Sequence, residues 1–362
     1  MPRRRPIRAP QPQNLFPVND TSKMITRPRF LPDNYVLALA GMVVLASFLP
    51  VRGQLAQAFD GVTAVAVGLL FFLHGAKLSR ESIVAGITHW RLHLAVLAST
   101  FLLIPLLGIA LGPLLTRLVG PDLYLGILFL CVLPSTVQSS IALTSVARGN
   151  VPAAVCSASA SNFLGIFLTP VLAGLVLSLH GEGQSSLDSV FKIVVQLLLP
   201  FVAGHLARRW IGAWVARRKS LLKYVDQGSI LLVVYTAFSE AVVQGLWQQL
   251  PAGALAGLLV ANALLLGLAI GITTWVSRRL GFSREDEVVM VFCGSKKSLA
   301  SGVPIAKVLF AGNVVGVMVL PLMLFHQMQL MLCAVLANRY ARRAAAAEAK
   351  AQIAADPALP AK

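Results

Sequence analysis

The sequence predicts an all-α membrane protein whose chain crosses the bilayer many times. Hydrophobic residues make up 57% of its 362 positions and charged residues only 12%, about half the charged share of a soluble domain. Apolar segments of about twenty residues recur along the chain, and each is long enough to span the ~30 Å hydrocarbon core as a helix. The net charge of +17 comes from basic residues in short runs between these segments. This pattern indicates cytoplasmic loops and not a nucleic-acid-binding face.

Ten apolar segments are expected to form the membrane spans. In chain order they cover residues 33–50, 60–79, 92–116, 123–147, 151–179, 187–208, 224–245, 252–276, 286–309 and 313–337. An even number of spans places both termini on the same side of the membrane. Basic residues gather in alternate loops such as 209–222, whereas the loops at 180–186 and 244–253 carry no Lys or Arg. This asymmetry predicts that both termini are cytoplasmic.

The regions flanking the spans are expected to be cytoplasmic tails. Residues 1–30 are basic and Pro-rich and lack the apolar core of a secretory signal, so we expect a disordered tail. Residues 341–362 are expected to form a C-terminal tail whose first part can extend the last helix. The ten-helix domain then occupies 31–340.

The four cysteines lie within apolar segments without metal-ligand spacing and are expected to pack as small hydrophobic residues; they are Cys131, Cys156, Cys293 and Cys333.

Two segments at corresponding positions in the chain are interrupted by small, polar and Pro residues. Five spans in each half, about 33–179 and 187–337, give the halves opposite orientations, as in an inverted repeat. The interruptions are LPSTVQSSIALTS (133–145) and CGSKKSLASGVP (293–304), each in the fourth span of its half. Such breaks expose carbonyl and amide groups at membrane depth, where they can bind ions. They therefore indicate a transporter binding site, the alternative being Ser and Thr that bond to their own helices.

Lys296 and Lys297 lie deep in the ninth segment. They follow the acidic inner end of this segment, at Glu285–Glu287, by about ten residues or roughly 15 Å. An ionisable side chain at this depth indicates a functional site. The alternatives are that the lysines snorkel to the interface or neutralise Glu240 of the seventh segment. His74 and His326 are further candidates for a proton path, although a histidine satisfied at a helix end is the simpler interpretation.

Four further stretches carry a resemblance: PSTVQSSIALTSVARGN, ARGNVPAAVCSASASNFLGIFLTPVL, FFLHGAKLSRES and GSKKSLASGVPIAKVLF. The first two resemble the bile acid:sodium symporter family. The last two resemble its SBF-like subgroup, which includes relatives of solute carrier family 10 member 7. The resemblance covers about residues 30–340. It implies ten helices in two inverted five-helix repeats. Helices 1, 2, 6 and 7 would form a panel domain and the others a core domain, in which the broken helices 4 and 9 cross.

The resemblance also implies where ions and substrate bind. The candidate residues belong to helices 4, 5 and 9; they are Ser139, Ser140, Thr144, Ser157, Ser159, Asn162, Gly294, Ser295, Lys296, Lys297 and Ser298. The family has an acid at the position of Phe292 and a Gln at that of Lys296. A lysine ammonium ~4 Å from a sodium ion would repel it by ~4 kcal/mol at an effective dielectric of ~20, weakening sodium binding about a thousandfold. Lys296, with Lys297 as second choice, is therefore hypothesised to replace a bound cation, as a fixed charge or a titrating one.

Taken together, these features predict a secondary transporter in the plasma (inner) membrane that moves a small organic anion by alternating access. The coupling ion would be a proton or sodium, with sodium coupling placed in doubt by the two lysines, and no cofactor is expected. The chain has no Gly-rich phosphate loop, zinc motif or nucleophile elbow, so neither nucleotide-driven pumping nor enzymatic catalysis is expected. The alternative function is a non-transporting membrane regulator of calcium handling.

Overall fold

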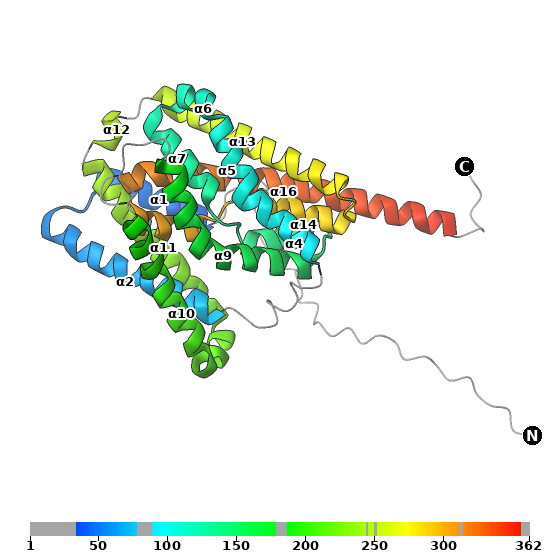
Figure 1. Cartoon of the computed structure of the whole chain (residues 1–362), viewed down its shortest axis with the longest axis horizontal. Coiled ribbons are helices and arrows are strands. Elements are labelled where there is room, and N and C mark those ends of the chain that lie inside the picture. The colour runs from blue at the N-terminus through cyan, green and yellow to red at the C-terminus, as the bar shows by residue number, and fades with distance from the viewer. Residues whose placement is uncertain are drawn as a thin grey trace, which may run out of the picture. The chain divides into compact units, whose positions relative to one another are not determined.

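The computed structural model describes residues 34–77, 89–178, 187–243, 245–249, 252–310 and 314–355. Every regular element in these ranges is a helix, and no strand occurs among them (Figure 1). The predicted tail at 1–30 and the predicted outer loop at 180–186 lie outside the described residues.

Each of the ten expected segments coincides with helical residues. The elements are α1 (Asn34–Phe48), α2 (Gly53–Lys77), α4 (Trp90–Ala98), the π-helix η2 (Ser99–Leu103), α5 (Ile104–Ala110), α6 (Gly112–Val119), α7 (Pro121–Val132), α8 (Gln138–Val146), α9 (Val151–Ser178), α10 (Leu187–Arg217), α11 (Lys219–Val243), α12 (Leu246–Gln249), α13 (Ala252–Arg279), α14 (Arg284–Gly294), α15 (Leu299–Leu309) and α16 (Val314–Ala355).

Two helices extend well beyond their expected ends. The expected loop at 209–222 is helical except for a turn at Arg218, because its Arg, Lys and Leu residues end the apolar stretch without breaking a helix. The last helix continues past residue 340 to Ala355 through an Ala-rich sequence with high helix propensity. The region predicted as a C-terminal tail is therefore partly helical, and its last residues, 356–362, lie outside the described part.

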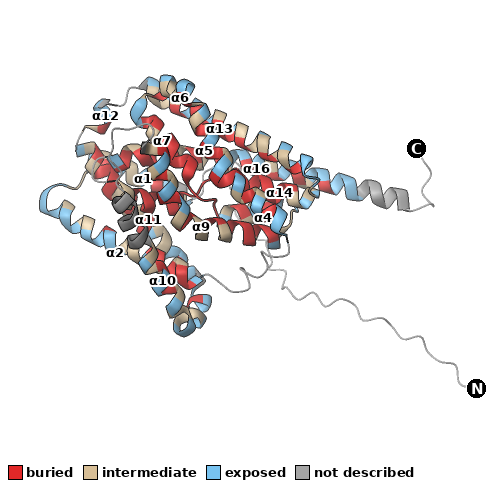
Figure 2. Cartoon of the chain, in the orientation of Figure 1, coloured by how far each residue is buried: buried red, intermediate tan, exposed pale blue. Residues whose placement is uncertain are grey.

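The lengths and surfaces of the helices fit a lipid environment. Among the described residues, five helices are long and apolar enough to cross a membrane: Gly53–Lys77, Trp90–Ala110, Val151–Leu177, Gly253–Arg279 and Val314–Glu348. Leu37–Phe48 and Pro121–Val132 are shorter apolar helices. Buried residues line the inner faces of the packed helices, and many exposed positions on α2, α10 and α13 carry large apolar side chains (Figure 2). The chain is thus an all-α polytopic membrane protein.

The helices pack in two groups. In the first group, α2 packs along α10, and α11 packs against α1 and α2. In the second group, α7 packs against α16 and α9, and α13 packs against α6, α14 and α16. Contacts of α10 and α11 with α9, α15 and α16 join the two groups.

Two glycines allow the closest helix crossing in the first group. A Cβ atom on Gly75 of α2 would lie 1.9 Å from the carbonyl oxygen of Phe201 in α10. A Cβ atom on Gly204 of α10 would likewise lie 1.9 Å from the carbonyl oxygen of Phe72 in α2. The two backbones therefore touch at this crossing, which only residues without a Cβ atom permit.

Both predicted interruptions are real breaks. Residues 133–137 separate α7 from α8, and residues 295–298 separate α14 from α15. The breaks are bonded to each other, because the backbone N–H of Ser298 donates to the carbonyl of Pro134 at 2.8 Å. In addition, the Ser140 hydroxyl donates to the carbonyl of Phe292 at 2.8 Å. Two irregular segments far apart in the sequence thus satisfy each other's backbone groups.

Candidate functional site

The break after α7 frees several carbonyl groups, and each has a partner from another part of the chain. Thr169 donates its hydroxyl to the Val132 carbonyl at 3.0 Å, and Ser298 donates its N–H to Pro134. The Asn162 side-chain amide donates to the Ser135 carbonyl at 2.6 Å. A buried carbonyl without a partner would be costly, so this break is held by side chains placed for it. The carbonyls of Cys131 and Leu133 are also freed by the break, and both accept hydrogen bonds from the same donor.

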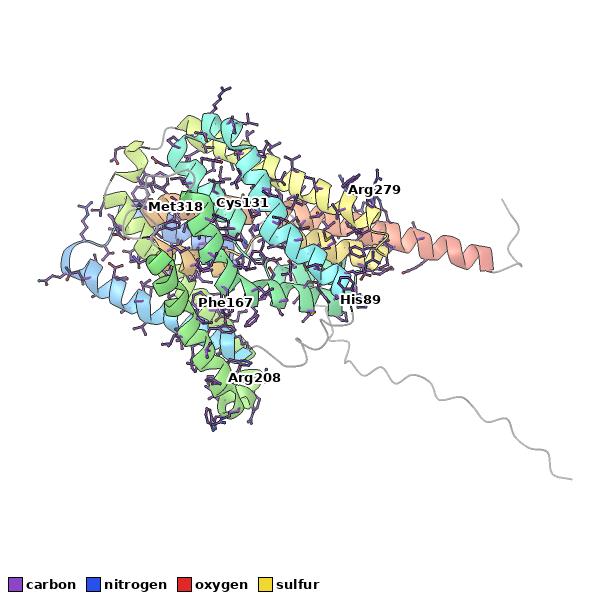
Figure 3. The ribbon with its side chains drawn as sticks, viewed as in Figure 1. His89, Cys131, Phe167, Arg208, Arg279 and Met318 are labelled. Carbon is purple, nitrogen blue, oxygen red and sulfur yellow. The ribbon has the colours of Figure 1, made fainter. Side chains whose placement is uncertain are left out.

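That donor is the ammonium group of Lys297. Its Nζ atom lies 2.7 Å from the Thr100 carbonyl oxygen, 2.7 Å from that of Cys131 and 2.8 Å from that of Leu133. An ammonium has three N–H donors, so donors and acceptors match one to one. The Lys297 side chain is wholly buried, and Cys131 lies in the interior of the packed helices (Figure 3). Because Cys131 and Leu133 stand at the C-terminal end of α7, the helix dipole also favours a cation here. We call these three carbonyls the carbonyl cage.

The Thr100 carbonyl is available because of local helix geometry. In η2 the N–H of Ile104 bonds to the carbonyl of Ser99, five residues earlier, so it does not bond to Thr100. The next donor in that register would be Pro105, which has no N–H. A π-helical turn followed by proline therefore leaves one carbonyl of this long helix without a backbone partner, and π-turns of this kind often mark functional sites.

Gln329 of α16 fixes the backbone of Lys297. Its Oε1 accepts the Lys297 N–H at 2.9 Å, and its Nε2 donates to the Lys297 carbonyl at 2.9 Å. The same Nε2 lies 2.9 Å from the Nδ1 atom of His326, a residue that lines the cavity described below. Gln329 thus connects the break between α14 and α15 to the cavity wall through His326.

Lys296 has a different environment from its neighbour. The Lys296 Nζ donates to the Ser139 hydroxyl of α8 at 2.7 Å. Ser139 in turn donates to Thr136 at 2.9 Å, and the Thr136 and Ser140 hydroxyls lie 2.8 Å apart. Lys296 is also wholly buried. In the described part of the chain, no carboxylate forms an ion pair with either lysine.

A cavity of about 580 Å³ lies between the two packing groups. The second group contributes the breaks and helix starts at Pro134, Gln138, Ser139, Ser298 and Ser301, together with Ser159, Asn162 and His326. The first group contributes the ends of its helices, with Tyr35, His74, Lys77, Lys223 and Asp226. Lys77 and Asp226 form an ion pair across α2 and α11. The volume is in the range of pockets that hold drug-sized molecules.

Four of the eleven predicted site residues line this cavity: Ser139, Ser159, Asn162 and Ser298. Asn162 also accepts a hydrogen bond from the Ser301 hydroxyl at 2.7 Å, which ties α9 to the start of α15. Lys296 lies directly behind Ser139 and does not line the cavity, and Lys297 lies in the carbonyl cage.

The other predicted residues have structural contacts. Ser140 bonds to Phe292 as described, and Ser295 donates to the carbonyl of Val291 in its own helix at 2.6 Å, the alternative foreseen for such serines. Ser157 bonds to His93 at 2.7 Å, away from the cavity. Thr144 is the exception, because its side chain is buried and its hydroxyl has no hydrogen-bond partner in the described part of the chain. A Cβ on Gly294 would approach the Cβ of Ser99 to 3.2 Å, so this glycine permits close packing.

Sequence reasoning did not identify Thr100, Thr136, Ser301 and Gln329. The available signals were weak: a proline five residues after Thr100 and an amide in the apolar middle of the last helix.

The four cysteines are free and buried, as expected of packing residues. Among the described residues, no group of three or more His, Cys, Asp or Glu side chains could hold a metal ion.

Lys307 joins the two packing groups at the far ends of their helices. Its Nζ lies 2.8 Å from Asp60 Oδ1 of α2 and 3.6 Å from Glu240 Oε2 of α11. Glu240 therefore pairs with Lys307 of α15, and not with Lys296 or Lys297 as the counter-charge alternative required. The Lys307 side chain is only 18% exposed, so these ion pairs link the two groups at a partly buried position.

Comparison with known proteins identifies the family. Residues 33–342 match the sequence model of the SBF-like CPA transporter family. The chain belongs to this family. An uncharacterized protein of Pseudomonas aeruginosa is 67% identical over 90% of this chain and 99% of its own length. YfeH of Escherichia coli, whose name classes it among symporters, is 56% identical over 90% of this chain and 98% of its own length. Rat sodium/bile acid cotransporter 7 is 29% identical over 76% of this chain and 82% of its own length.

These relatives confirm the resemblance that the sequence motifs indicated. The matched region spans both helix breaks and both lysines, and it ends before the last turns of α16. The family is described as a transporter family, and the names of YfeH and of the rat protein class them as a symporter and a cotransporter, which are not enzymes. A transporter of this family implies a small-molecule substrate and a lipid environment.

Proposed function

We propose that this SBF-like protein is a secondary transporter that moves a small organic anion by alternating access. The observation that carries the proposal is the cavity between the two packing groups, because its wall contains both helix breaks. Alternating access requires a binding site between two bodies that can move relative to each other. The ten spans, as two inverted five-helix repeats, supply these bodies: α1, α2, α10 and α11 form the panel, and the remaining spans form the core.

The charges around the cavity favour an anion. The N-terminal ends of α8 and α15 both reach the cavity wall, at Gln138 and Leu299, and a helix N-terminus carries partial positive charge. Lys296 lies behind Ser139, and Lys223 lies at the wall beside the Lys77–Asp226 ion pair. Ser139, Ser159, Asn162 and Ser298 supply polar side chains to the same wall.

The orientation of the chain follows from its loop charges. With both termini cytoplasmic, the wall residues Tyr35, His74 and Lys223 lie at the cytoplasmic ends of their helices. Lys307, Asp60 and Glu240 then lie towards the outer ends. The structure would represent an inward-facing state whose outer side is closed by the Lys307 ion pairs. The transporter names of the relatives do not favour the alternative of a calcium-handling regulator.

Binding of an anion to the cavity should be measurable in purified protein. A ligand that binds only the folded state at a hundredfold excess over its Kd adds about 2.7 kcal/mol to the free energy of unfolding. We expect some members of an organic-anion panel to raise the melting temperature of the wild type. Ala142→Trp, which fills the cavity from α8, should abolish the increase.

Ala256→Trp is the matched control, because Ala256 of α13 is exposed and does not line the cavity. It should retain the response to the same anions. Anions that stabilise Ala142→Trp and the wild type equally would place the binding site elsewhere and contradict the proposal.

A further inference from the structure

We propose that the Lys297 ammonium is a built-in cation that fills the cation site of this transporter, so that the protein needs no free sodium ion at the helix breaks. The inference deepens the proposed function, on which it rests. Its basis is the carbonyl cage formed by Thr100, Cys131 and Leu133 around the Lys297 Nζ atom.

The cage has the composition of a transporter cation site. Unwound backbone carbonyls and the C-terminal ends of half-helices coordinate the driving cation in transporters with broken helices. Here one carbonyl belongs to the last turn of α7, one to the break that follows, and one to the π-helical turn η2. Two regions that are separate in the sequence, one at Thr100 and one at residues 131–133, therefore converge on a single positive charge, and neither contributes a carboxylate.

The ammonium leaves no role for a second cation in this cage. All three N–H donors are used, and the Lys297 side chain has no exposed surface. A free cation ~4 Å from the ammonium would bind about a thousandfold more weakly than in its absence. Because the ammonium is covalently attached to the chain, no entropy is lost in capturing a free ion. Gln329 also holds the backbone of Lys297 in place by bonding to both its N–H and its carbonyl.

The two adjacent lysines have different roles in this inference. Lys296 bonds to a single hydroxyl next to the cavity, where it can act on the substrate through Ser139. Lys297 is sealed off from the cavity and bonds only to backbone carbonyls through its Nζ. The geometry thus makes Lys297, the second choice from the sequence, the residue that replaces a bound cation.

Thermal unfolding of the detergent-purified chain tests the inference without relying on transport. The melting temperature is measured in about 0.15 M sodium chloride and in choline chloride of the same concentration. We expect the wild type to melt at the same temperature in both salts. Lys297→Ala empties the cage, so it should melt several degrees lower in choline chloride, and added sodium should restore part of the loss saturably.

Two outcomes would overturn the inference. One is a saturable, sodium-specific rise in the melting temperature of the wild type, which would show that a free cation still binds; this result counts even if Lys297→Ala does not fold. The other is a Lys297→Ala variant that folds but melts identically in both salts, which would show that the cage does not select a cation. Lys296→Ala is the matched control. This substitution removes an ammonium that bonds only to the Ser139 hydroxyl and leaves the carbonyl cage occupied by Lys297, so sodium should not stabilise the variant.

The inference and the proposed function can fail separately. Should the salt experiment succeed while no anion binds the cavity, the built-in cation would stand and the transport proposal would fall. In the reverse case, with anion transport observed and a sodium-stabilised wild type, Lys297 would be a structural residue beside a working sodium site. In a transporting protein, Lys297→Met should reduce anion uptake about tenfold or more, because the cage then holds no charge.

Discussion

Gly75→Ala is expected to destabilise the protein severely. The new Cβ atom would lie 1.9 Å from a carbonyl oxygen of α10 and 2.9 Å from the His205 backbone nitrogen. Because both neighbours are backbone atoms, no side chain can rotate to relieve the clash, and α2 must separate from α10. Overpacking of a well-packed site costs about 1–3 kcal/mol or more, and this one lies between two backbones. We expect a loss of about 3 kcal/mol, seen as a lower melting temperature and less monodisperse protein in size-exclusion chromatography.

Gly68→Ala in the same helix is the matched control. A Cβ atom at Gly68 would meet no atom within 4 Å, so only helix propensity changes. Alanine is favoured over glycine in a helix by about 1 kcal/mol, and this variant should be as stable as the wild type or more so. Equal stability of the two variants would mean that the α2–α10 crossing is looser than described.

Lys307→Met is expected to open the outer side of the protein. It leaves Asp60 of α2 and Glu240 of the neighbouring α11 without the cation that they share. Partly exposed ion pairs contribute only about 0.2–1 kcal/mol each, but both are lost together and two unpaired carboxylates remain. We expect a cysteine at the cavity-lining position 142, introduced as Ala142→Cys, to react about tenfold faster with a membrane-impermeant maleimide added from outside.

The charge-reversed pair Lys307→Asp with Asp60→Lys is the control for this experiment. It places a cation within reach of Glu240 from the other side and should return labelling towards the wild-type rate. The four native cysteines are buried, so the protein without Ala142→Cys sets the background. If Lys307→Met leaves the labelling rate unchanged, the ion pairs do not hold the outer side closed.

Much of the fold is encoded in local sequence patterns. Hydrophobicity over about twenty residues locates the helices, because the bilayer requires that length of apolar side chains. The breaks at 133–137 and 295–298 are visible in the sequence because Pro134, the serines and the lysines do not fit an apolar helix. Helix ends were predicted less well: charged and Ala-rich residues end an apolar segment but not a helix, as the lengths of α10 and α16 show.

The contacts of the site were beyond local patterns. Which of the two adjacent lysines meets the carbonyl cage depends on the direction that each side chain takes from the break, and its partners lie more than 150 positions away in the sequence. The Thr100 carbonyl is freed by a π-helical register that its own sequence does not reveal. The pairing of Gly75 with Gly204 and of Lys307 with Glu240 joins residues more than sixty positions apart, where a single sequence carries no distance information.

The most direct test of the account is anion uptake into liposomes containing the purified wild-type protein, with sodium replaced by choline on both sides. The account predicts saturable uptake of an organic anion that persists in choline and is abolished by the cavity-filling variant Ala142→Trp but not by Ala256→Trp. Two results would contradict the account. One is that no anion that binds the cavity enters the liposomes faster than it enters protein-free liposomes. The other is equal uptake by the wild type and Ala142→Trp.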